Sequence, residues 1–384
     1  MQSLNDFAAS KLAALETRQL RRRLAETERA PEGAALRAGR RLISFSCNDY
    51  LGLSRDPRVL EAANAAAAQY GTGAGASRLV TGNHPLYRAL EARLARLKGT
   101  DDACVFGSGY LANLGIIPSL VGPDDLILAD ELSHACLLAG GALASGRLER
   151  FRHNDVDHLE TLLEEHRADH NRALILTDGV FSMDGDLAPL PELAHLAKRF
   201  DAWLMTDDAH GIGVLGGGRG SSFEPGNNAP VPLQMGTLSK AIGSYGGYLC
   251  ASQSVIDLIR TRARTFIYST GLPPSVVAAS IAALEIIETE PGLVAKPRAL
   301  ARQFTERLGL PDATSSIVPL VLGAPERALR ASALLEEAGF LVTAIRPPTV
   351  PEGTARLRFA FSATHAPDDV MRLANIVRAE ILEA

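Results

Sequence analysis

Residues 173–213 read ALILTDGVFSMDGDLAPLPELAHLAKRFDAWLMTDDAHGIG, and this stretch decides the fold. Two short apolar runs, at 173–178 and 202–208, flank a stretch at 189–200 in which the apolar residues have helical spacing. Apolar runs of this length predict strands that are buried on both faces, and a helix between them predicts that the strands are parallel. The stretch therefore predicts one strand–helix–strand unit of a mainly parallel sheet.

The same alternation continues toward the N-terminus. Apolar runs at 103–106, 125–130 and 147–151 are each followed by a helical pattern. Repeated strand and helix patterns of this kind predict the α/β class, with a mainly parallel sheet covered by helices.

A break at Pro291-Gly292 precedes a new strand–helix–strand series and suggests a second, smaller α/β domain. The expected division is an N-terminal helical segment at 1–45, a large domain at 46–285 and a small C-terminal domain at 286–384.

Composition excludes several classes of protein. A chain of 384 residues with 46% hydrophobic residues can bury a large core. Its formal net charge of −5 argues against nucleic-acid binding, which requires an excess of Lys and Arg. The four cysteines are widely spaced with no CxxC pair, so we expect neither disulfides nor a zinc site, and a reducing, cytoplasmic location. We expect no secretory signal and no membrane span, because no apolar run is long enough.

Residues whose side chains can bind a ligand or take part in catalysis lie at the carboxyl ends of the predicted strands, where ligands bind in such sheets. Ser182 follows the strand at 173–178, Asp207 lies at the end of the next strand, and His210 comes three residues after Asp207. GSGY at 107–110 opens a helix, whose N-terminus favours an anion such as a phosphate. Taken alone, GSGY can be a tight turn between a strand and a helix, and the Asp207–His210 spacing can be a surface turn whose polar groups are hydrogen-bonded. A metal site is disfavoured because no further His or Cys lies nearby in sequence.

Lys240 stands among small residues in GTLSKAIGSYGG, 236–247, with no acidic neighbour. A lysine in a tight pocket loses hydration, so its pKa falls and the neutral amine can attack an aldehyde. Because Ala241 follows it, the lysine does not fit a Walker phosphate loop, and the glycines at 71–82 follow a helix rather than a dinucleotide-binding strand. The alternative is an exposed loop lysine. Combined with the acid, the histidine and the helix start, Lys240 predicts a pyridoxal-phosphate pocket.

The chain closely resembles the α-oxoamine synthases, pyridoxal-phosphate enzymes with the fold of aspartate aminotransferase (fold type I). The motifs that carry the resemblance extend over nearly the whole chain: NDYLGLS (48–54), GTGAGASRLVTGNHPLYRALE (71–91), GSGYLAN (107–113), LSHACLL (132–138), FRHND (151–155), GVFSMDGD (179–186), DDAHGIG (207–213), GTLSKAIGSYGG (236–247), IYSTGLPP (267–274) and TARLRFAFSATH (354–365).

This resemblance implies a role for each candidate cofactor residue. Lys240 would be the Schiff-base lysine and the acid/base at the substrate α-carbon, Asp207 would pair with the pyridinium nitrogen, and His134 would stack on the ring. On its own, His134 is a core or capping histidine. The further contacts implied are His210 and Ser182 on the 3′-oxygen side, Gly109, Tyr110 and Thr237 along the cofactor, and Ser269 or Thr270 on the phosphate from a second subunit.

The contact from a second subunit would make the protein an obligate homodimer. Tyr110 is a mild departure from the family, which often has phenylalanine at this position, and its hydroxyl needs a partner.

The family condenses an amino acid with an acyl thioester and releases the amino acid's carboxylate as CO2. Arg358 matches the residue that places this carboxylate, and a guanidinium fork suits that task. The segment TAIRPPTVPEGTARLR, 343–358, looks most like the member that joins L-alanine to a pimeloyl thioester, and Thr349 and Arg21 match its substrate-binding positions. Asn48 is a further candidate substrate contact. The alternatives are an exposed strand arginine for Arg358, a solvated helix face for Arg21 and a backbone cap for Asn48.

Two other functions stay open at this point. The same pocket could condense glycine with acetyl-CoA or succinyl-CoA, against which the IRPPTVP run argues, or the fold could bind the cofactor without catalysis. The sequence does not decide whether CoA or a carrier protein bears the pimeloyl group, since no compact basic patch marks either partner.

Overall fold

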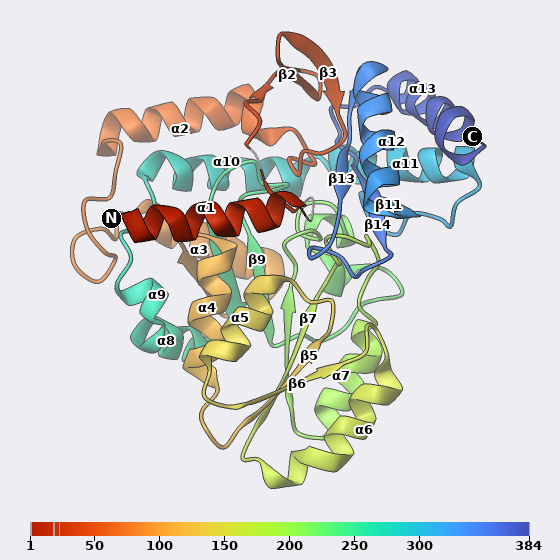
Figure 1. The fold of residues 1–384 in the computed structure, drawn as a ribbon. Helices are drawn as coiled ribbons and strands as arrows, with labels where there is room; N and C mark the ends of the chain where they lie inside the picture. Colours follow the sequence, from red (N-terminus) through yellow and green to blue (C-terminus); the bar gives the residue numbers. More distant parts are fainter. Residues whose placement is uncertain (1, 18–19, 23, 384) are drawn as a thin grey trace. The chain divides into compact units, whose positions relative to one another are not determined.

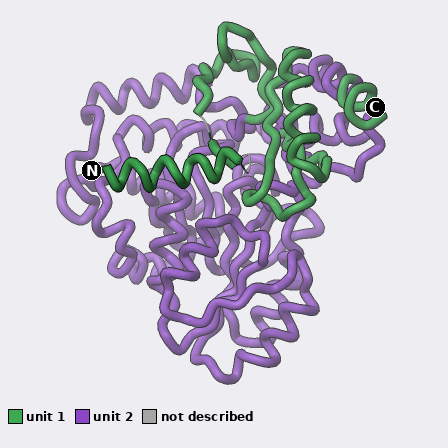
Figure 2. The backbone as a smooth tube through the Cα atoms, viewed as in Figure 1, with its two compact units in different colours: residues 1–46, 319–359, 376–384 green, residues 47–318, 360–375 purple. Residues whose placement is uncertain are grey.

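The computed structural model describes residues 2–17, 20–22 and 24–383. By backbone contacts the chain groups into two compact units, which are described separately (Figure 2). Unit 1 contains residues 1–46, 319–359 and 376–384, and unit 2 contains residues 47–318 and 360–375. The sequential division at residues 46 and 286 stays a prediction about folding domains, whereas the grouping by contacts places residues 286–318 in unit 2.

Unit 2 is built from alternating strands and helices (Figure 1). Its strands are β4 (Asp102–Phe106), β5 (Leu126–Asp130), β6 (Arg147–Phe151), β7 (Ala173–Asp178), β8 (Trp203–Asp207), β9 (Leu233–Thr237) and β10 (Gly247–Ala251). Its helices are α2 (Pro57–Tyr70), α3 (Leu86–Lys98), α4 (Gly109–Leu120), α5 (Ala135–Leu143), α6 (Val156–His166), α7 (Leu190–Arg199), α8 (Gln253–Arg262), α9 (Arg264–Ile267), α10 (Pro274–Thr289) and α11 (Pro291–Leu308).

These strands form one sheet in the order β4-β10-β9-β8-β7-β5-β6. Strands β9, β8, β7, β5 and β6 pair in parallel, and β10 is antiparallel to both of its neighbours, β4 and β9. The mainly parallel sheet expected from the sequence is confirmed, and β6 and β7 have the expected bounds. The sequence analysis did not include β10, which follows the glycine-rich turn after Lys240.

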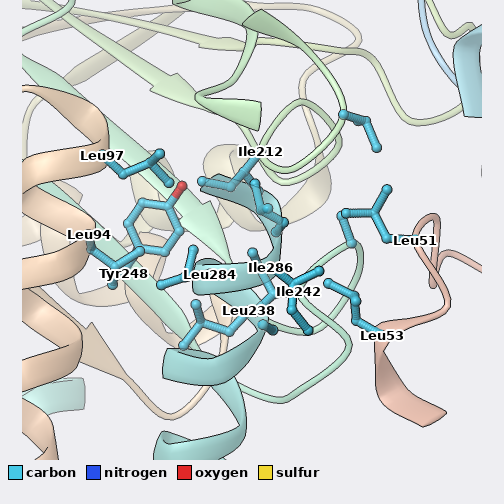
Figure 3. Close-up of a cluster of buried hydrophobic side chains, with 14 of the residues drawn as sticks. Leu51, Leu53, Leu94, Leu97, Ile212, Leu238, Ile242, Tyr248, Leu284 and Ile286 are labelled. Carbon is cyan, nitrogen blue, oxygen red and sulfur yellow. The ribbon is translucent and has the colours of Figure 1, made fainter. Parts of the chain in front are cut away.

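The two faces of this sheet are both apolar, as buried parallel strands require. Cys104 and Phe106 of β4 pack in a cluster with residues of α4, whereas Ala103 and Val105 pack in a cluster with residues of α3 and α10. Figure 3 shows the second cluster, in which Tyr248 of β10 lies among leucines of α3 and α10. A third cluster joins the alternate residues of β5 and β7 to α6 and α7. Helices therefore cover both faces, and the ends of the strands remain as the place for polar side chains.

The break at Pro291-Gly292 is shorter than the sequence suggests. Helix α10 ends at Thr289, and α11 begins at Pro291 with its proline at the first helical position. Proline is tolerated there because its missing N–H would have no partner inside the helix. One residue, Glu290, thus separates the two helices.

Unit 1 contains two small sheets. The first has the order β1-β2-β3-β12 and the second has the order β11-β14-β13. The elements of unit 1 are α1 (Gln2–Thr17), β1 (Glu28–Arg29), β2 (Ala34–Arg37), β3 (Arg40–Ser44), β11 (Ile317–Gly323), α12 (Pro325–Glu337), β12 (Phe340–Leu341), β13 (Thr343–Ile345) and β14 (Ala355–Ala360), of which β11 and β14 each extend into unit 2 at one end. Most of α13 (Pro367–Val377) belongs to unit 2, and the π-helical turn that extends it to Leu382 belongs to unit 1.

Candidate active site

Five segments that carry predicted site residues begin at the same edge of the unit 2 sheet. The carboxyl ends of β5, β7, β8 and β9 lead into the segments of His134, Ser182, His210 and Lys240. Helix α4 begins at Gly109, directly after β4. Parallel strands end at one edge, so the topology alone explains why residues from 109 to 240 gather there.

Lys240 begins a chain of hydrogen-bonding groups. Its Nζ lies 2.7 Å from Nε2 of His210, whose Nδ1 lies 2.6 Å from the Tyr50 hydroxyl. That hydroxyl donates to Oδ1 of Asn48 at 3.2 Å. Since Tyr50 donates to Asn48, it accepts from Nδ1–H, which leaves Nε2 to accept from the lysine. The Tyr50 hydroxyl thus holds one nitrogen of the His210 ring, and the other nitrogen contacts the lysine amine.

Asp207 is the last residue of β8 and is buried, with 4% of its surface exposed. Its Oδ1 accepts from the backbone N–H of Ala209 at 3.0 Å, and its Oδ2 accepts from Nδ2 of Asn113 at 2.8 Å. Donors on both oxygens fix the orientation of the carboxyl group. A fixed, desolvated negative charge at this position can stabilise a cationic group.

His134 precedes α5 and caps it. Nδ1 of its ring accepts from the backbone N–H of Cys136 at 3.3 Å and lies 2.8 Å from the Cys136 thiol. The backbone N–H of His134 donates to Oδ2 of Asp178 at 2.8 Å. Although the residue is exposed at the rim, neighbouring atoms desolvate the ring and lower its pKa. The capping interpretation therefore holds for Nδ1, and the ring faces remain available to pack against a planar ligand.

The start of α4 is closely packed against the beginning of β10. Ser108 caps α4 by accepting from the Leu111 N–H, and a Cβ on Gly247 would lie 2.5 Å from the Ser108 carbonyl oxygen. Thr237 is buried at the end of β9 and donates to the Gly246 carbonyl at 2.7 Å. The helix start is thereby fixed in place with its free N–H groups, which suits an anion.

Replacing Gly247 by alanine tests this packing. The added methyl group has backbone atoms of residues 108 and 109 as neighbours, which cannot move aside without shifting the start of α4. We expect pyridoxal phosphate to bind about tenfold more weakly and the free energy of unfolding to fall by about 1–3 kcal/mol, as for other overpacked sites. Equilibrium dialysis and urea unfolding measure the two effects.

The matched control is Gly292→Ala, because a Cβ at Gly292 meets nothing within 4 Å. Equal cofactor affinity in the two variants would contradict the role given to the start of α4.

The Ser182 loop is held by an imidazole between two carboxylates. His153 Nδ1 lies 3.1 Å from Asp130, the last residue of β5, and its Nε2 lies 2.8 Å from Asp186. Burial alone would lower the pKa of His153, but hydrogen bonds to Asp130 and Asp186 outweigh it and raise the pKa to about 10. A cationic His153 thus connects the segment after β5, which carries His134, to the loop that carries Ser182.

A raised pKa in the folded state makes the stability from His153 fully present below pH 6.5 and lost as the pH rises toward 10. We expect wild-type protein to lose about 2 kcal/mol more of its free energy of unfolding between pH 7 and pH 10 than His153→Gln. Urea unfolding at both pH values, at one protein concentration, measures this difference. Identical pH dependence in the two proteins would contradict the charge assigned to His153.

The structure places the remaining predicted residues of unit 2 as follows. Gly109 opens α4, and Tyr110 beside it is 48% exposed. Ser269 and Thr270 follow α9, and Thr270 pairs through an isolated β-bridge with Ser77 of the glycine-rich loop. Ser182 is half-buried.

Three predicted substrate residues belong to unit 1. Arg358 lies in β14 opposite Thr343 of β13 and is 7% exposed, so it is not the exposed strand arginine of the alternative interpretation. Thr349 is exposed in the segment between β13 and β14. Arg21 is also exposed and donates to Glu16 of α1 at 3.2 Å.

Residues 2–17, 20–22 and 24–383 contain no group of three or more His, Cys, Asp or Glu side chains that could hold a metal ion. Within the same described ranges, no helix is both long and apolar enough to cross a membrane.

Residues 40–377 match the model of the class I and II aminotransferase family. The chain belongs to this family. It is 67% identical over 343 residues to the 8-amino-7-oxononanoate synthase of Methylocella silvestris, an alignment that covers 89% of this chain and 98% of the relative. It is 62% identical over 380 residues to the enzyme of the same name from Beijerinckia indica, with 98% of both chains covered.

Solved structures of this family show the same fold. A serine palmitoyltransferase from S. paucimobilis, with PLP and myriocin bound, matches with a TM-score of 0.91 at 29% identity, covering 99% of this chain and 98% of that one. The 8-amino-7-oxononanoate synthase of Francisella tularensis matches with a TM-score of 0.76 at 26% identity, covering 89% and 98%. The chain is thus an α-oxoamine synthase within the class I and II aminotransferase family, and its fold is fold type I.

Sequence reasoning missed four residues that contact the α-oxoamine synthase site. Tyr50 and Asn113 lie inside motifs that were quoted for the resemblance, but their bonds to His210 and Asp207 join segments far apart in the chain. Cys136 lies two residues from His134, and Asp178 is the last residue of β7, directly opposite Asp207 in the strand register. The strand-end position of Asp178 is the one signal that the sequence offered.

Proposed function

We propose that this protein uses pyridoxal phosphate to condense L-alanine with a pimeloyl thioester, giving 8-amino-7-oxononanoate, CO2 and a free thiol, a step of biotin biosynthesis. The observation that carries the proposal is the 2.7 Å contact of Lys240 with His210 at the sheet edge that also holds Asp207. Full-length relatives at 62–67% identity that are named for this activity support the choice of substrates.

The residues at this edge fit the cofactor by the chemistry of their donors and acceptors. Lys240 can bond the aldehyde carbon, Asp207 supplies an anion for the ring nitrogen, and the start of α4 at Gly109 offers N–H groups to the phosphate. His210 and Ser182 would face the ring oxygen, His134 would cover the ring, and Tyr110 and Thr237 would complete the cradle. When bound, the cofactor withdraws electrons from the substrate α-carbon.

In this reaction the protein moves one proton and one acyl group. Lys240 takes the proton from the α-carbon of alanine while His210 holds its amine in place. The α-carbon then bonds to the thioester carbonyl carbon, and the C–S bond breaks to release the thiol. Loss of the carboxylate as CO2 follows, and Lys240 returns a proton to the same carbon.

Arg358 would orient the alanine carboxylate before it leaves. Its guanidinium is buried in β14, where a planar fork has a fixed direction and can bind a carboxylate with two hydrogen bonds. Asn48, held by the Tyr50 hydroxyl, would contact the substrate beside His210.

The pimeloyl chain would lie against the segment of residues 345–351. Within unit 1, a hollow of about 810 Å³ is lined by Leu15, Leu20 and Pro325 and by apolar residues of this segment. The charged side chains in its lining are Arg346, Glu326 and Glu352. Thr349 belongs to the segment, and Arg21 follows Leu20 in the chain. An apolar hollow with an arginine nearby suits an aliphatic chain that ends in a carboxylate.

We further infer a homodimer in which Ser269 or Thr270 of one subunit reaches the phosphate held by the other. Tyr268, which precedes Ser269, and Tyr110 at the start of α4 are exposed aromatic groups that a second subunit would cover. The dispersed free cysteines favour a reducing, cytoplasmic location.

Thiol release by the purified protein loaded with pyridoxal phosphate tests the choice of substrates. We expect release that depends on both L-alanine and pimeloyl-CoA, and at least about a hundredfold less with glycine and acetyl-CoA or succinyl-CoA. Release only with glycine and acetyl-CoA or succinyl-CoA would support the same type of reaction but would show that the proposed substrates are wrong. Absence of release with every pair, and of α-proton exchange with any small amino acid, would favour a cofactor-binding module without catalysis.

A further inference from the structure

Three carboxyl groups lie at the adjoining ends of β7 and β8. Asp178 ends β7, Asp207 ends β8 opposite it, and Asp208 follows. They are only 3%, 4% and 1% exposed. Buried carboxylates so close together oppose each other's ionisation, so the surroundings of each decide which one carries the negative charge.

Asp178 holds the segment of His134. Its Oδ2 accepts from the backbone N–H of His134 at 2.8 Å. Burial, reinforced by the charge of Asp207, raises the pKa of Asp178 well above its ordinary value. The raised pKa favours the protonated, uncharged form of this side chain.

Asp208 is neutralised in a different way. Its Oδ2 lies 2.9 Å from Nζ of Lys98, and the two side chains are 1% and 0% exposed. Lys98 is the last residue of α3 and also donates to the Arg219 carbonyl at 2.6 Å, and Asp208 accepts from the Ser221 N–H at 3.1 Å. The pair has no net charge, and its hydrogen bonds fix both partners.

Glycines enclose the Asp208 carboxylate on three sides. A Cβ on Gly179, Gly211 or Gly220 would lie 2.8, 2.0 or 1.7 Å from its oxygens. Asp208 also accepts from the N–H groups of Gly211 and Ile212 through its backbone carbonyl. The turn that carries His210 is therefore built around this one side chain.

Asp207 is held by hydrogen bonds to both of its carboxylate oxygens. Two N–H donors contact its oxygens, at 2.8 and 3.0 Å. The titratable and charged groups that face it from the neighbouring segments are Asp178, Asp208, His134, Cys136, Lys240 and Tyr248.

We propose that Lys98 is a positioning residue for this reaction: by pairing with Asp208 it neutralises that buried carboxylate and holds the turn of residues 207–210, which carries Asp207 and His210. The inference rests on the proposed function, in which Asp207 serves the ring nitrogen of the cofactor. Lys98 acts as the counter-charge of Asp208.

The test is a pH titration of the visible absorbance band of the cofactor-loaded protein. Lys98→Met leaves a buried negative charge that favours the protonated form of the chromophore, so the midpoint should rise by about half a pH unit or more. Asp208→Asn leaves a buried positive charge and should lower the midpoint by a similar amount. Lys98→Arg and the double variant Lys98→Met/Asp208→Asn should have midpoints near that of the wild type.

Midpoint shifts of opposite sign in Lys98→Met and Asp208→Asn distinguish this role from a loss of packing. A loss of packing would shift both midpoints in the same direction or would shift neither. Shifts of equal sign, or no shift in either variant, overturn the proposal. If Lys98→Met does not fold, the nearly isosteric Asp208→Asn carries the test, and its midpoint must fall. Wild-type protein without a visible band, or Lys240→Ala that retains the band, would instead refute the proposed function itself.

Discussion

Lys240→Ala is expected to lose the visible absorbance band of the cofactor-loaded protein and to lower turnover about 10⁴-fold or more. The variant lacks the amine that bonds the cofactor and the base that removes the α-proton, so two functions disappear together. It also leaves Nε2 of His210 without the lysine that lies 2.7 Å away. Absorbance spectra and thiol release measure the two losses.

The matched control is Lys198→Ala, because Lys198 is an exposed residue in the last turn of α7. It should leave both the band and the turnover unchanged. A Lys240→Ala protein with the band and the activity of the wild type would show that another amine holds the cofactor.

Asp207→Asn should have the second largest effect, a fall in kcat on the order of 10²–10⁴-fold. The amide keeps the shape of the side chain but removes the charge, so the ring nitrogen of the cofactor is no longer held protonated. KM for L-alanine should change much less, because this residue does not contact the amino acid carboxylate. Steady-state kinetics at several pH values separate the two parameters.

Asp157→Asn on the exposed first turn of α6 is the control for this substitution. If Asp207→Asn altered only KM, its role would be in binding and not in stabilising charge at the ring.

The sheet could be predicted from the sequence because its strands are buried on both faces. The runs at 147–151 and 173–178 are bounded by turn residues, and β6 and β7 have these bounds. Strand β10 follows β9 after a short turn and pairs antiparallel with it. Its other antiparallel pairing, with β4, joins residues more than 140 positions apart in the chain, which no local pattern shows.

The site residues that lie at strand ends or in family motifs could be predicted from the sequence. Lys240, His210 and Asp207 follow strands, so their gathering at one edge follows from the topology. The bond of Tyr50 to His210 and the pair Lys98–Asp208 were not predictable, because each joins side chains more than 100 residues apart. The capping role of His134 could be predicted, because it joins residues that are close together in the chain.

The fate of the alanine carboxylate tests the central claim most directly. The loaded protein would be given L-alanine labelled with ¹³C in the carboxyl group together with pimeloyl-CoA, and CO2, thiol and amino ketone would be quantified. The proposed condensation requires one labelled CO2 for each thiol released, and an unlabelled product with the mass of 8-amino-7-oxononanoate. Label retained in pyruvate, with no thiol released, would show transamination and would contradict the proposal.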